Sequence, residues 1–400
     1  MPSAGWHVIV GDNGSGKSSF LKAIGLALIG PNAAYALRQP WEQWRRQESE
    51  YGRIRLEIVR DPSVDQPSGK GRRDNLIDFS VTVMVGSEGV YGKSAWGTPT
   101  EHDVWGNVEG WFSASYGPFR RFRGGDPEYK TVSQSLPRLG RHLSLFDESV
   151  ALSECLEWLQ TLRFKQLEKD PEGAILKPLI RFINQKGFLP FEVKLHSISS
   201  TSVKFVDGNG AEVDVENLSD GYRSILSMTF ELIRQMAATY GADAVFDPDD
   251  PSRVIAPGVV LIDEIDAHLH PTWQRRVGVW FREHFPNIQF IVTTHSPIIC
   301  QAADPGSVYR LPAPGTDENG RFIRGDELKR LIYGNILDAY GTEVFGDGIT
   351  RSAKSRELLE ELATLNVKET RDGLDADEKR RQRELQRILP TSAYETPNGK

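Results

Sequence analysis

The sequence is poor in cysteine, in long apolar runs and in excess positive charge. Its 400 residues contain two cysteines, Cys155 and Cys300, which are too few and too unpatterned for a disulfide framework or a zinc site and suit a reducing cytoplasm. It has neither an apolar run of membrane length nor a signal peptide ahead of residue 6, so membrane insertion is not expected. The formal net charge of −7 gives no overall basic surface, and any contact with nucleic acid therefore requires a local patch.

The composition and the absence of repeats bound the architecture. An apolar fraction of 39% suits a soluble globular chain that buries a core in one large domain or two modest ones. Sustained heptads do not occur before Leu218, which excludes long coiled-coil arms in that part of the chain.

A phosphate-binding pattern stands near the start of the chain. The short apolar run Val8–Val10 predicts a strand, and an amphipathic run from Lys17 predicts a helix. The residues between them match G-x-x-x-x-G-K-[ST] at every fixed position: Gly11, Asp12, Asn13, Gly14, Ser15, Gly16, Lys17 and Ser18. A glycine-rich turn without a ligand is the alternative, and the strand before and helix after favour the phosphate site.

The chemistry of this pattern explains its spacing. Glycines let the backbone curl so that successive N–H groups point at phosphate oxygens, and the helix adds its positive N-terminal end. Lys17 is expected to reach the β- and γ-phosphates, and the Ser18 hydroxyl to bind Mg²⁺. Ser19 follows at the same helix start and is expected among the nucleotide-binding residues. ATP with Mg²⁺ is therefore the expected ligand.

A second run ends in two acids. Val259–Ile262 is apolar throughout, as in a strand buried on both faces of a parallel sheet, and Asp263 and Glu264 follow it directly. Acids at the carboxyl end of such a strand lie where α/β sheets bind ligands. We expect Asp263 to hold Mg²⁺ through water and Glu264 to polarise the attacking water. The two histidines in the next residues, 266–271, lack a third ligand nearby, which makes zinc a poor candidate.

Two further runs complete the expected core. Ile288–Val292 is another buried strand and ends in Thr-Thr-His-Ser-Pro, where His295 could touch the γ-phosphate through Nε2. A lone histidine there is more often structural, but the neighbouring motifs favour a functional one. Ser307–Leu311 is the last short strand. The sequence thus predicts an α/β protein whose parallel sheet contains Val8–Val10, Val259–Ile262 and these two runs.

The rest of the chain has weaker signals. Alternating apolar residues predict two antiparallel strands, Ile54–Ile58 and Ile77–Val85, with an exposed loop at 61–74 between them. Val108–Tyr116 looks like another strand. A helical subdomain is expected at about residues 149–240, with a hairpin turn at 207–210. The expected domains are residues 1–340 and a charged helical tail, 341–400.

Two smaller patterns concern anions. Arg120, Arg121 and Arg123 alternate with two phenylalanines and could grip phosphates of a nucleotide or nucleic acid; a solvated loop is equally favoured. Leu218–Tyr222 precedes a second helical run, and Ser219 is well placed as its N-cap. The N–H groups of that helix start form another anion-binding end, although capped helices are common.

Four motifs in their order along the chain resemble the ABC-type ATPase class. They are the P-loop, LSDGYRS, the apolar run that ends in Asp-Glu and is followed by HLHP, and TTHSP. The resemblance is to the soluble branch of this class, often labelled AAA-family ATPase, which includes the heads of structural-maintenance-of-chromosomes (SMC) proteins, RecF-like repair ATPases and ATPases of overcoming-lysogenization-defect and Septu-like phage defence. It covers about residues 6–311. It implies a P-loop NTPase with an ABC-like core sheet, an antiparallel β subdomain and a helical subdomain, and it implies ATP hydrolysis.

The resemblance also assigns roles by position. Leu218–Tyr222 matches the LSGGQ signature and keeps Ser219 and Gly221, the phosphate-facing members; Asp266 falls on the D-loop and His295 on the switch histidine. The class's glutamine after the strand that follows the P-loop region is missing, and Ser115–Tyr116 stand there. In the class the signature closes over ATP held by a second chain, which implies a head-to-tail homodimer.

Three functions remain open. The first is an ATP-hydrolysing enzyme in DNA transactions or phage defence, with DNA contact through the local patch of Arg120, Arg121 and Arg123. The second is the ATPase subunit of a membrane transporter. The residues of the DEIDAHLHP and TTHSP motifs disfavour it, because they resemble the DNA and defence branch. The third is a nucleotide-gated assembly switch with little turnover. Because nothing after Leu311 resembles a nuclease, any cutting would belong to a separate nuclease or effector subunit.

Overall fold

The computed structural model describes residues 4–44, 49–59, 61, 63–64, 78–86, 89–92, 105, 111–335, 344 and 353–389. The chain forms two units, residues 1–334 and residues 335–400, and each is described by itself. Three sequence predictions fall wholly or partly outside the described residues: those for Ile77, for most of the 61–74 loop and for Val108.

A six-stranded sheet forms the centre of the first unit, in the order β12-β11-β1-β10-β9-β5. Its strands are β1 (Gly5–Val10), β5 (Ser113–Tyr116), β9 (Gly258–Ile262), β10 (Ile288–Thr293), β11 (Gly306–Arg310) and β12 (Arg321–Phe322). The β11–β12 pair is antiparallel and the other neighbours are parallel. All four apolar runs predicted to build the sheet are in it, which confirms that prediction.

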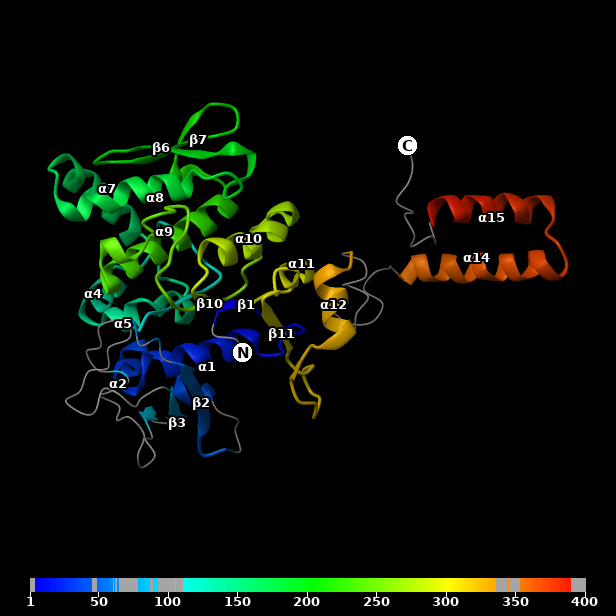
Figure 1. Ribbon diagram of the computed structural model, residues 1–400. Helices are drawn as coiled ribbons and strands as arrows, with labels where there is room; N and C mark the ends of the chain where they lie inside the picture. Colours follow the sequence, from blue (N-terminus) through cyan, green and yellow to red (C-terminus); the bar gives the residue numbers. More distant parts are fainter. Residues whose placement is uncertain are drawn as a thin grey trace. The chain divides into compact units, whose positions relative to one another are not determined.

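Helices cover both faces of this sheet because its strands are apolar on both faces (Figure 1). On one face lies α1 (Lys17–Ile29), whose Leu21 and Leu26 are fully buried in a cluster with Ile9 of β1. On the other lies α10 (Pro271–His284), whose Phe281 packs against Trp6 and Phe290 with ring centroids 6.5 and 5.4 Å away.

A smaller antiparallel sheet lies on the α1 side, in the order β2 (Gly52–Val59), β3 (Asp78–Val85) and β4 (Val90–Gly92). Ile54, Leu56 and Ile58 alternate with exposed residues and pack against the α1 cluster. The prediction of an antiparallel pair with one face turned inward is confirmed for the described part.

Residues 149–240 contain helices and a third sheet. The main elements are α7 (Glu154–Leu167), α8 (Leu176–Ile183), β6 (Lys194–Ile198), β7 (Val203–Val206), β8 (Glu212–Asp214) and α9 (Asp220–Tyr240). The strands form the antiparallel sheet β6-β7-β8, and the β7–β8 turn at residues 207–210 confirms the predicted hairpin. The segment expected to be helical is therefore mixed, and its first helix begins at Glu154.

Short elements complete the first unit. The α-helices are α2 (Pro31–Ala34), α4 (Pro127–Ser135), α5 (Pro137–Gly140), α6 (Leu143–Phe146), α11 (Pro297–Cys300) and α12 (Gly325–Tyr333). The 3-10 turns are η1 (Tyr35–Leu37), η2 (Trp41–Trp44), η3 (Pro171–Ile175), η4 (Pro190–Glu192), η5 (Val215–Asn217) and η6 (Ala242–Ala244).

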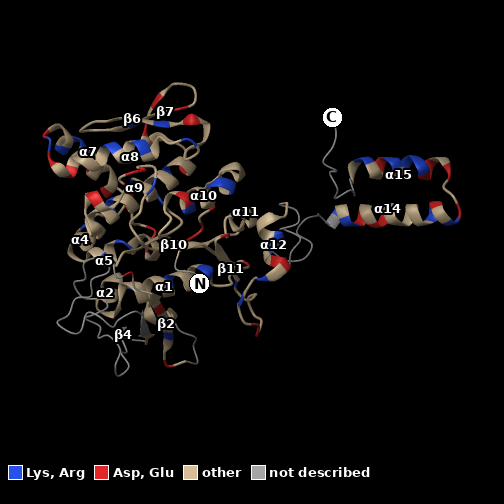
Figure 2. Ribbon diagram, viewed as in Figure 1, with Lys and Arg blue, Asp and Glu red and all other residues tan. Residues whose placement is uncertain are grey.

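Two helices make up the described part of the second unit, α14 (Ala353–Arg371) and α15 (Ala376–Ile388). Leu362, Leu385 and Leu389 are buried between them. A capping box at Asp375 begins α15, and both signs of charge line the two helices (Figure 2).

The structure also bears on disulfide bonds and on membrane-spanning helices. Cys155 and Cys300 are both buried free thiols. Within the described part of the chain, no single helix has the length and apolar composition of a membrane span. The pair formed by Lys17–Ile29 and Pro31–Leu37, bent by 118°, meets the criteria of length and composition alone.

Candidate functional site

The predicted phosphate loop connects β1 to α1 and is shaped by its glycines. Gly14 and Gly16 have φ values of 80° and 89°, in the left-handed region that L side chains rarely adopt. Gly16 precedes the first residue of α1, and a Cβ atom added to it would meet no atom within 4 Å. The glycine there is thus required by the backbone conformation, and the loop is open on the side where a side chain would project.

Lys17 folds back over this loop. The residue is 7% exposed, and its Nζ donates hydrogen bonds to the carbonyl oxygens of Gly11 at 2.8 Å and Asp12 at 3.0 Å. Burial lowers the pKa of the lysine, and nearby carboxylates, first that of Glu264, oppose the shift. The ammonium group therefore lies within electrostatic reach of the acids that follow β9.

The serines of the loop fit an anion and a metal ion. Ser15 Oγ is buried and has no hydrogen-bond partner among the described residues, which leaves a donor turned into the loop. The first N–H groups of α1 have no acceptors within the helix, and an anion at the helix start accepts hydrogen bonds from them. Ser18 is half-buried. Four other residues predicted to bind nucleotide are exposed and accessible to a ligand: Asp12, Asn13, Gly14 and Ser19. These donors suit a phosphate chain, and the Ser18 hydroxyl and the Asp263 carboxylate are oxygen groups of the kind that Mg²⁺ binds.

The turn after β9 is tightly held. Asp263 is 3% exposed, and its backbone N–H donates to Tyr116 O of β5 at 2.8 Å. Its carboxylate accepts a hydrogen bond from Thr293 Oγ1 at 2.5 Å. Glu264 has a φ of 45°, an uncommon conformation for a residue with a side chain, and its N–H donates to the same Thr293 Oγ1 at 2.8 Å.

The end of β10 joins the phosphate loop to this turn. The Thr294 N–H donates to Ile9 O of β1 at 3.3 Å, and Thr294 Oγ1 donates to the Asp266 carboxylate at 2.5 Å. Thr293 and Thr294 are adjacent in the chain and thus bind the carboxylates of Asp263 and Asp266, respectively. His295 follows at the same edge of the sheet and is exposed. The structure brings the P-loop, Asp263–Glu264 and the His295 segment to one edge, as the parallel strand order requires.

One of the three arginines considered as a basic patch, Arg120, is buried. Arg120 is 4% exposed and donates hydrogen bonds to the carbonyl oxygens of Asp263 at 2.8 Å and Glu264 at 3.1 Å. Arg121 donates to backbone carbonyls, and Arg123 pairs with Glu216. The prediction that Arg120 belongs to a DNA-binding patch is wrong, because its guanidinium lies inside the protein.

The start of α9 differs from the sequence expectation in one respect. Ser219 is the N-cap residue, as predicted, although its side chain makes no capping hydrogen bond among the described residues. Gly221 is buried, and a Cβ atom there would lie 2.8 Å from His268 O. Asp220 pairs with Arg223 and is exposed. The absence of a side chain at Gly221 thus permits close contact between α9 and the segment after Glu264.

A cavity lies away from these residues. It has a volume of about 620 Å³, and residues of α4, α5 and α7 contribute to its wall together with Glu216 and Glu231. Four carboxylates of its wall form ion pairs: Glu157 with Lys130 at 2.7 Å, Glu216 with Arg123, and both Glu154 and Glu231 with Arg234. It contains none of the residues predicted to bind nucleotide.

Sequence reasoning missed the residues that support the acids. Thr293 and Thr294 were recognised as part of a motif without a role, and Arg120 was assigned to a surface. Tyr116, where the class's glutamine is missing, is fully buried, and its hydroxyl donates to Gln235 Oε1 at 3.2 Å. The sequence around Arg120 has no signal for its burial, because its partners are distant along the chain.

Comparisons with known proteins find relatives that carry ATPase names. Residues 128–301 match the family described as "AAA domain, putative AbiEii toxin, Type IV TA system", a range that includes the start of α9 and Asp263–Glu264 but not the P-loop. The chain is 38% identical over 106 residues to the retron Ec83 probable ATPase of Escherichia coli, covering 26% of this chain and 18% of that protein. It is 27% identical over 311 residues to the Septu protein PtuA of Bacillus mycoides (strain KBAB4), covering 76% of this chain and 36% of that protein.

The matches span about a third or less of the length of these relatives. Among solved structures, the head of Smc bound to the C-winged helix domain of ScpA aligns with 81% of this chain and 91% of that chain, at 16% identity and a TM-score of 0.46. The motifs and the sequence relatives make the chain similar to P-loop ATPases. Its fold is the predicted α/β P-loop NTPase fold.

Proposed function

We propose that the chain binds ATP with Mg²⁺ at the P-loop and hydrolyses it to ADP and phosphate. The observation that carries this proposal is the meeting of three motifs at one edge of the sheet, where Lys17 lies within the electrostatic field of Glu264 and Asp263. A phosphate loop alone serves many ligands. A phosphate loop beside two acids and a histidine suits cleavage of the terminal phosphoanhydride bond.

Each residue then has a role that its surroundings permit. The loop N–H groups and Lys17 hold the β- and γ-phosphates. Ser18 and Asp263 would hold Mg²⁺, which would supply charge neutralisation when bound. Glu264 accepts a proton from water as the water oxygen bonds to the γ-phosphorus. The bond from that phosphorus to the β–γ bridging oxygen breaks, so the electron pair leaves with ADP. His295 contacts the γ-phosphate from the end of β10.

Assembly follows from the second helix start. Ser219 and its neighbouring N–H groups form an anion-binding end that the chain's own side chains leave uncapped among the described residues. We infer that this end closes over the γ-phosphate held by a second copy, so that two chains pair head to tail about a two-fold axis and enclose two ATP molecules. ADP lacks the γ-phosphate and does not hold the pair.

The process that this cycle drives is proposed from the relatives. A retron probable ATPase and a Septu protein are among them, which supports a role in antiviral defence or another DNA-related process, with a separate nuclease or effector subunit as partner. Because Arg120 is buried, only Arg121 and Arg123 remain of the three arginines considered for contact with DNA. We therefore propose DNA contact only for the complex with the partner subunit.

Phosphate release by the purified protein tests the proposal. Wild type should release phosphate from ATP in the presence of Mg²⁺, and Glu264→Gln should lose roughly 100- to 10,000-fold in kcat while it retains ATP. Equal turnover by the two proteins would show that another group activates the water. Binding without turnover in the wild type would favour the nucleotide-gated switch.

A further inference from the structure

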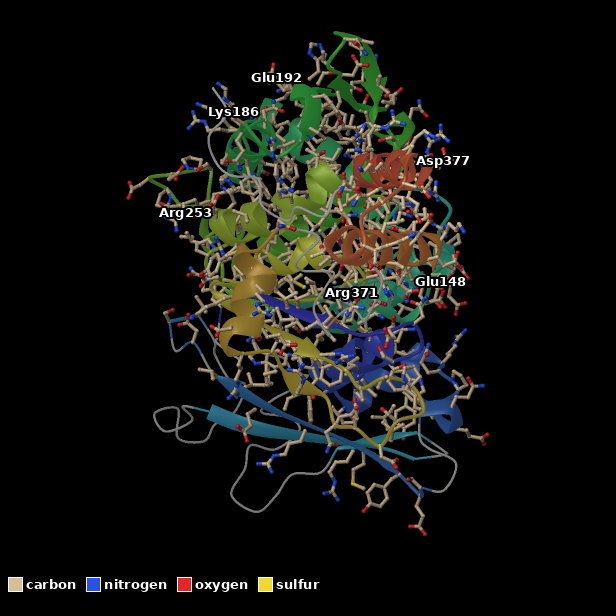
Figure 3. The ribbon with its side chains drawn as sticks, turned by 90° about the vertical axis from the view of Figure 1, so that its right-hand side faces the viewer. Glu148, Lys186, Glu192, Arg253, Arg371 and Asp377 are labelled. Atoms are coloured by element: carbon tan, nitrogen blue, oxygen red, sulfur yellow. The ribbon has the colours of Figure 1, made fainter. Side chains whose placement is uncertain are left out.

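Arg120 is the most deeply buried cation near the site and has an unusual set of partners. Charged side chains such as Lys186, Glu192 and Arg253 lie on the outside of the molecule (Figure 3), whereas Arg120 is 4% exposed. Burial lowers its pKa to about 10, and the carboxylates of Asp263, Asp266 and Glu264 oppose the shift. A guanidinium in such a place is retained only when its donors are satisfied.

The acceptors of Arg120 come from three separate segments and are all uncharged. Its Nη1 donates to Gly117 O at 2.9 Å and to Asp263 O at 2.8 Å, and its Nη2 donates to Glu264 O at 3.1 Å. Its Nε donates to Ser224 Oγ at 2.8 Å, and Ser224 is 1% exposed. One planar group therefore joins the end of β5, the turn after β9 and the second turn of α9.

The residue held most unusually in this arrangement is Glu264. Its left-handed φ of 45° costs energy for any residue with a side chain and persists only where the surroundings enforce it. Thr293 accepts the Glu264 N–H on one side, and Arg120 donates to the Glu264 carbonyl on the other. The Glu264 carbonyl also accepts a hydrogen bond from Ala267 N–H at 2.9 Å, so Thr293 and Arg120 add contacts from two other segments to a turn that is closed by its own backbone.

The hydrogen bond between Arg120 and Ser224 connects the Glu264 turn to α9. Ser224 lies five residues after Ser219, on the same helix, so a displacement of the start of α9 changes the hydrogen bond that orients Arg120. The chain also contains a matched link at the other end of the same elements. Arg141 donates to Ser113 O of β5 at 3.0 Å and to Thr239 Oγ1 of α9 at 3.3 Å, and burial lowers its pKa to about 10 as well.

We propose that Arg120 is a positioning residue for hydrolysis: it holds Glu264 in its left-handed conformation and couples that conformation to the start of α9. This inference rests on the proposed role of Glu264 in hydrolysis. Arg141, which joins the same strand and helix away from the acids, supplies structural support alone. The two arginines therefore separate a positioning function from simple packing.

The test compares Arg120→Lys with Arg141→Lys. Lysine keeps the charge but cannot reproduce the planar fork, so each variant loses buried hydrogen bonds. Arg120→Lys should lower kcat by roughly 10- to 100-fold, since small displacements of a catalytic group cost that much, with the Kd for ATP unchanged. Arg141→Lys should lower the melting temperature and leave kcat per folded molecule unchanged. Added guanidinium ion should restore part of the turnover of Arg120→Ala, and it should not affect Arg141→Ala.

A second readout does not depend on turnover. Amide hydrogen exchange at residues 264–267 of the nucleotide-free protein should be faster in Arg120→Lys than in wild type and unchanged in Arg141→Lys. Equal kcat losses in the two variants, or unchanged exchange in Arg120→Lys, would overturn the inference. If wild type binds ATP without hydrolysing it, the proposed function fails, and the exchange comparison alone decides whether Arg120 holds the Glu264 turn.

Discussion

The two glycine- and serine-bearing helix starts of this chain, at α1 and at α9, offer the same backbone chemistry but different side chains. At α1, Gly16 has open space around it, and Lys17 and the buried Ser15 hydroxyl add charged and polar donors. At α9, the space beside Gly221 is filled by His268 O. The nearby cation there, Arg223, is already paired with Asp220.

The difference indicates which start holds a phosphate by itself. The α1 start has an ammonium group whose hydrogen bonds go to carbonyls of its own loop, and phosphate oxygens can replace these acceptors. The α9 start offers N–H groups and the Ser219 hydroxyl without a free cation. In the proposed assembly it is half of a site, and a second chain presents the phosphate.

The largest expected effect is at Lys17. Lys17→Ala should weaken ATP binding by roughly 30-fold to several-thousand-fold, because removal of one member of a buried charge pair costs about 2–5 kcal/mol. Arg223→Ala is the matched change at the other start and should leave the Kd for ATP unchanged. Titration with a fluorescent ATP analogue measures both. Similar losses in the two variants would mean that both starts hold the nucleotide of their own chain.

The next effect is at Ser219. Ser219→Arg should lower kcat by roughly 100- to 1,000-fold, as expected when donors to a developing charge are lost, while the Kd for ATP in the monomer stays at the wild-type value. The long side chain blocks closure and leaves the P-loop intact. Steady-state kinetics and equilibrium binding on the same preparation give the two numbers. Wild-type turnover would remove Ser219 from the site.

Ser219→Ala sharpens this result. An N-cap serine ordinarily contributes about 1 kcal/mol through its side-chain hydrogen bond, and Ser219 makes none among the described residues. Ser219→Ala should therefore keep the melting temperature of the wild type while it weakens ATP-dependent pairing. A clear drop in melting temperature would show that the hydroxyl caps α9 in solution.

The changes at the glycines are expected to act on stability more than on turnover. Gly221→Ala should lower stability by about 1–3 kcal/mol, because the new methyl group meets His268 O, and should leave the Kd for ATP unchanged. Gly16→Ala meets no atom, so its stability cost of about 1–2 kcal/mol comes from the left-handed backbone, and its methyl group should weaken ATP binding. Thermal unfolding with and without ATP separates these outcomes, and an opposite pattern would reverse the assignment of the two starts.

Much of the fold could be predicted because its signals are local. A continuous apolar run such as Val259–Ile262 identifies a buried strand, and alternation in Ile54–Ile58 identifies a strand with one buried face. The phosphate loop is fixed by residues within eight positions of one another. The three-stranded sheet at 194–214 was harder, because its strands are three to five residues long and only its hairpin turn has a clear signal.

The supporting residues could not be predicted because their partners are distant in sequence. Arg120 meets Asp263 across 143 positions and Ser224 across 104, and no local pattern indicates that an arginine in a loop will be buried. The left-handed conformation of Glu264 likewise follows from Thr293 and Arg120 and not from its neighbours. The missing cap at Ser219 shows the same limit, since position at a helix start does not determine where a hydroxyl points.

The measurement that tests the account most directly is sedimentation of Glu264→Gln with ATP and with ADP. If α1 holds the nucleotide and α9 completes the site of a second copy, this variant should sediment as a dimer with ATP and Mg²⁺ and as a monomer with ADP. A monomer under both conditions, with wild type still hydrolysing ATP, would mean that one chain forms the whole site and would contradict the assignment of Leu218–Tyr222.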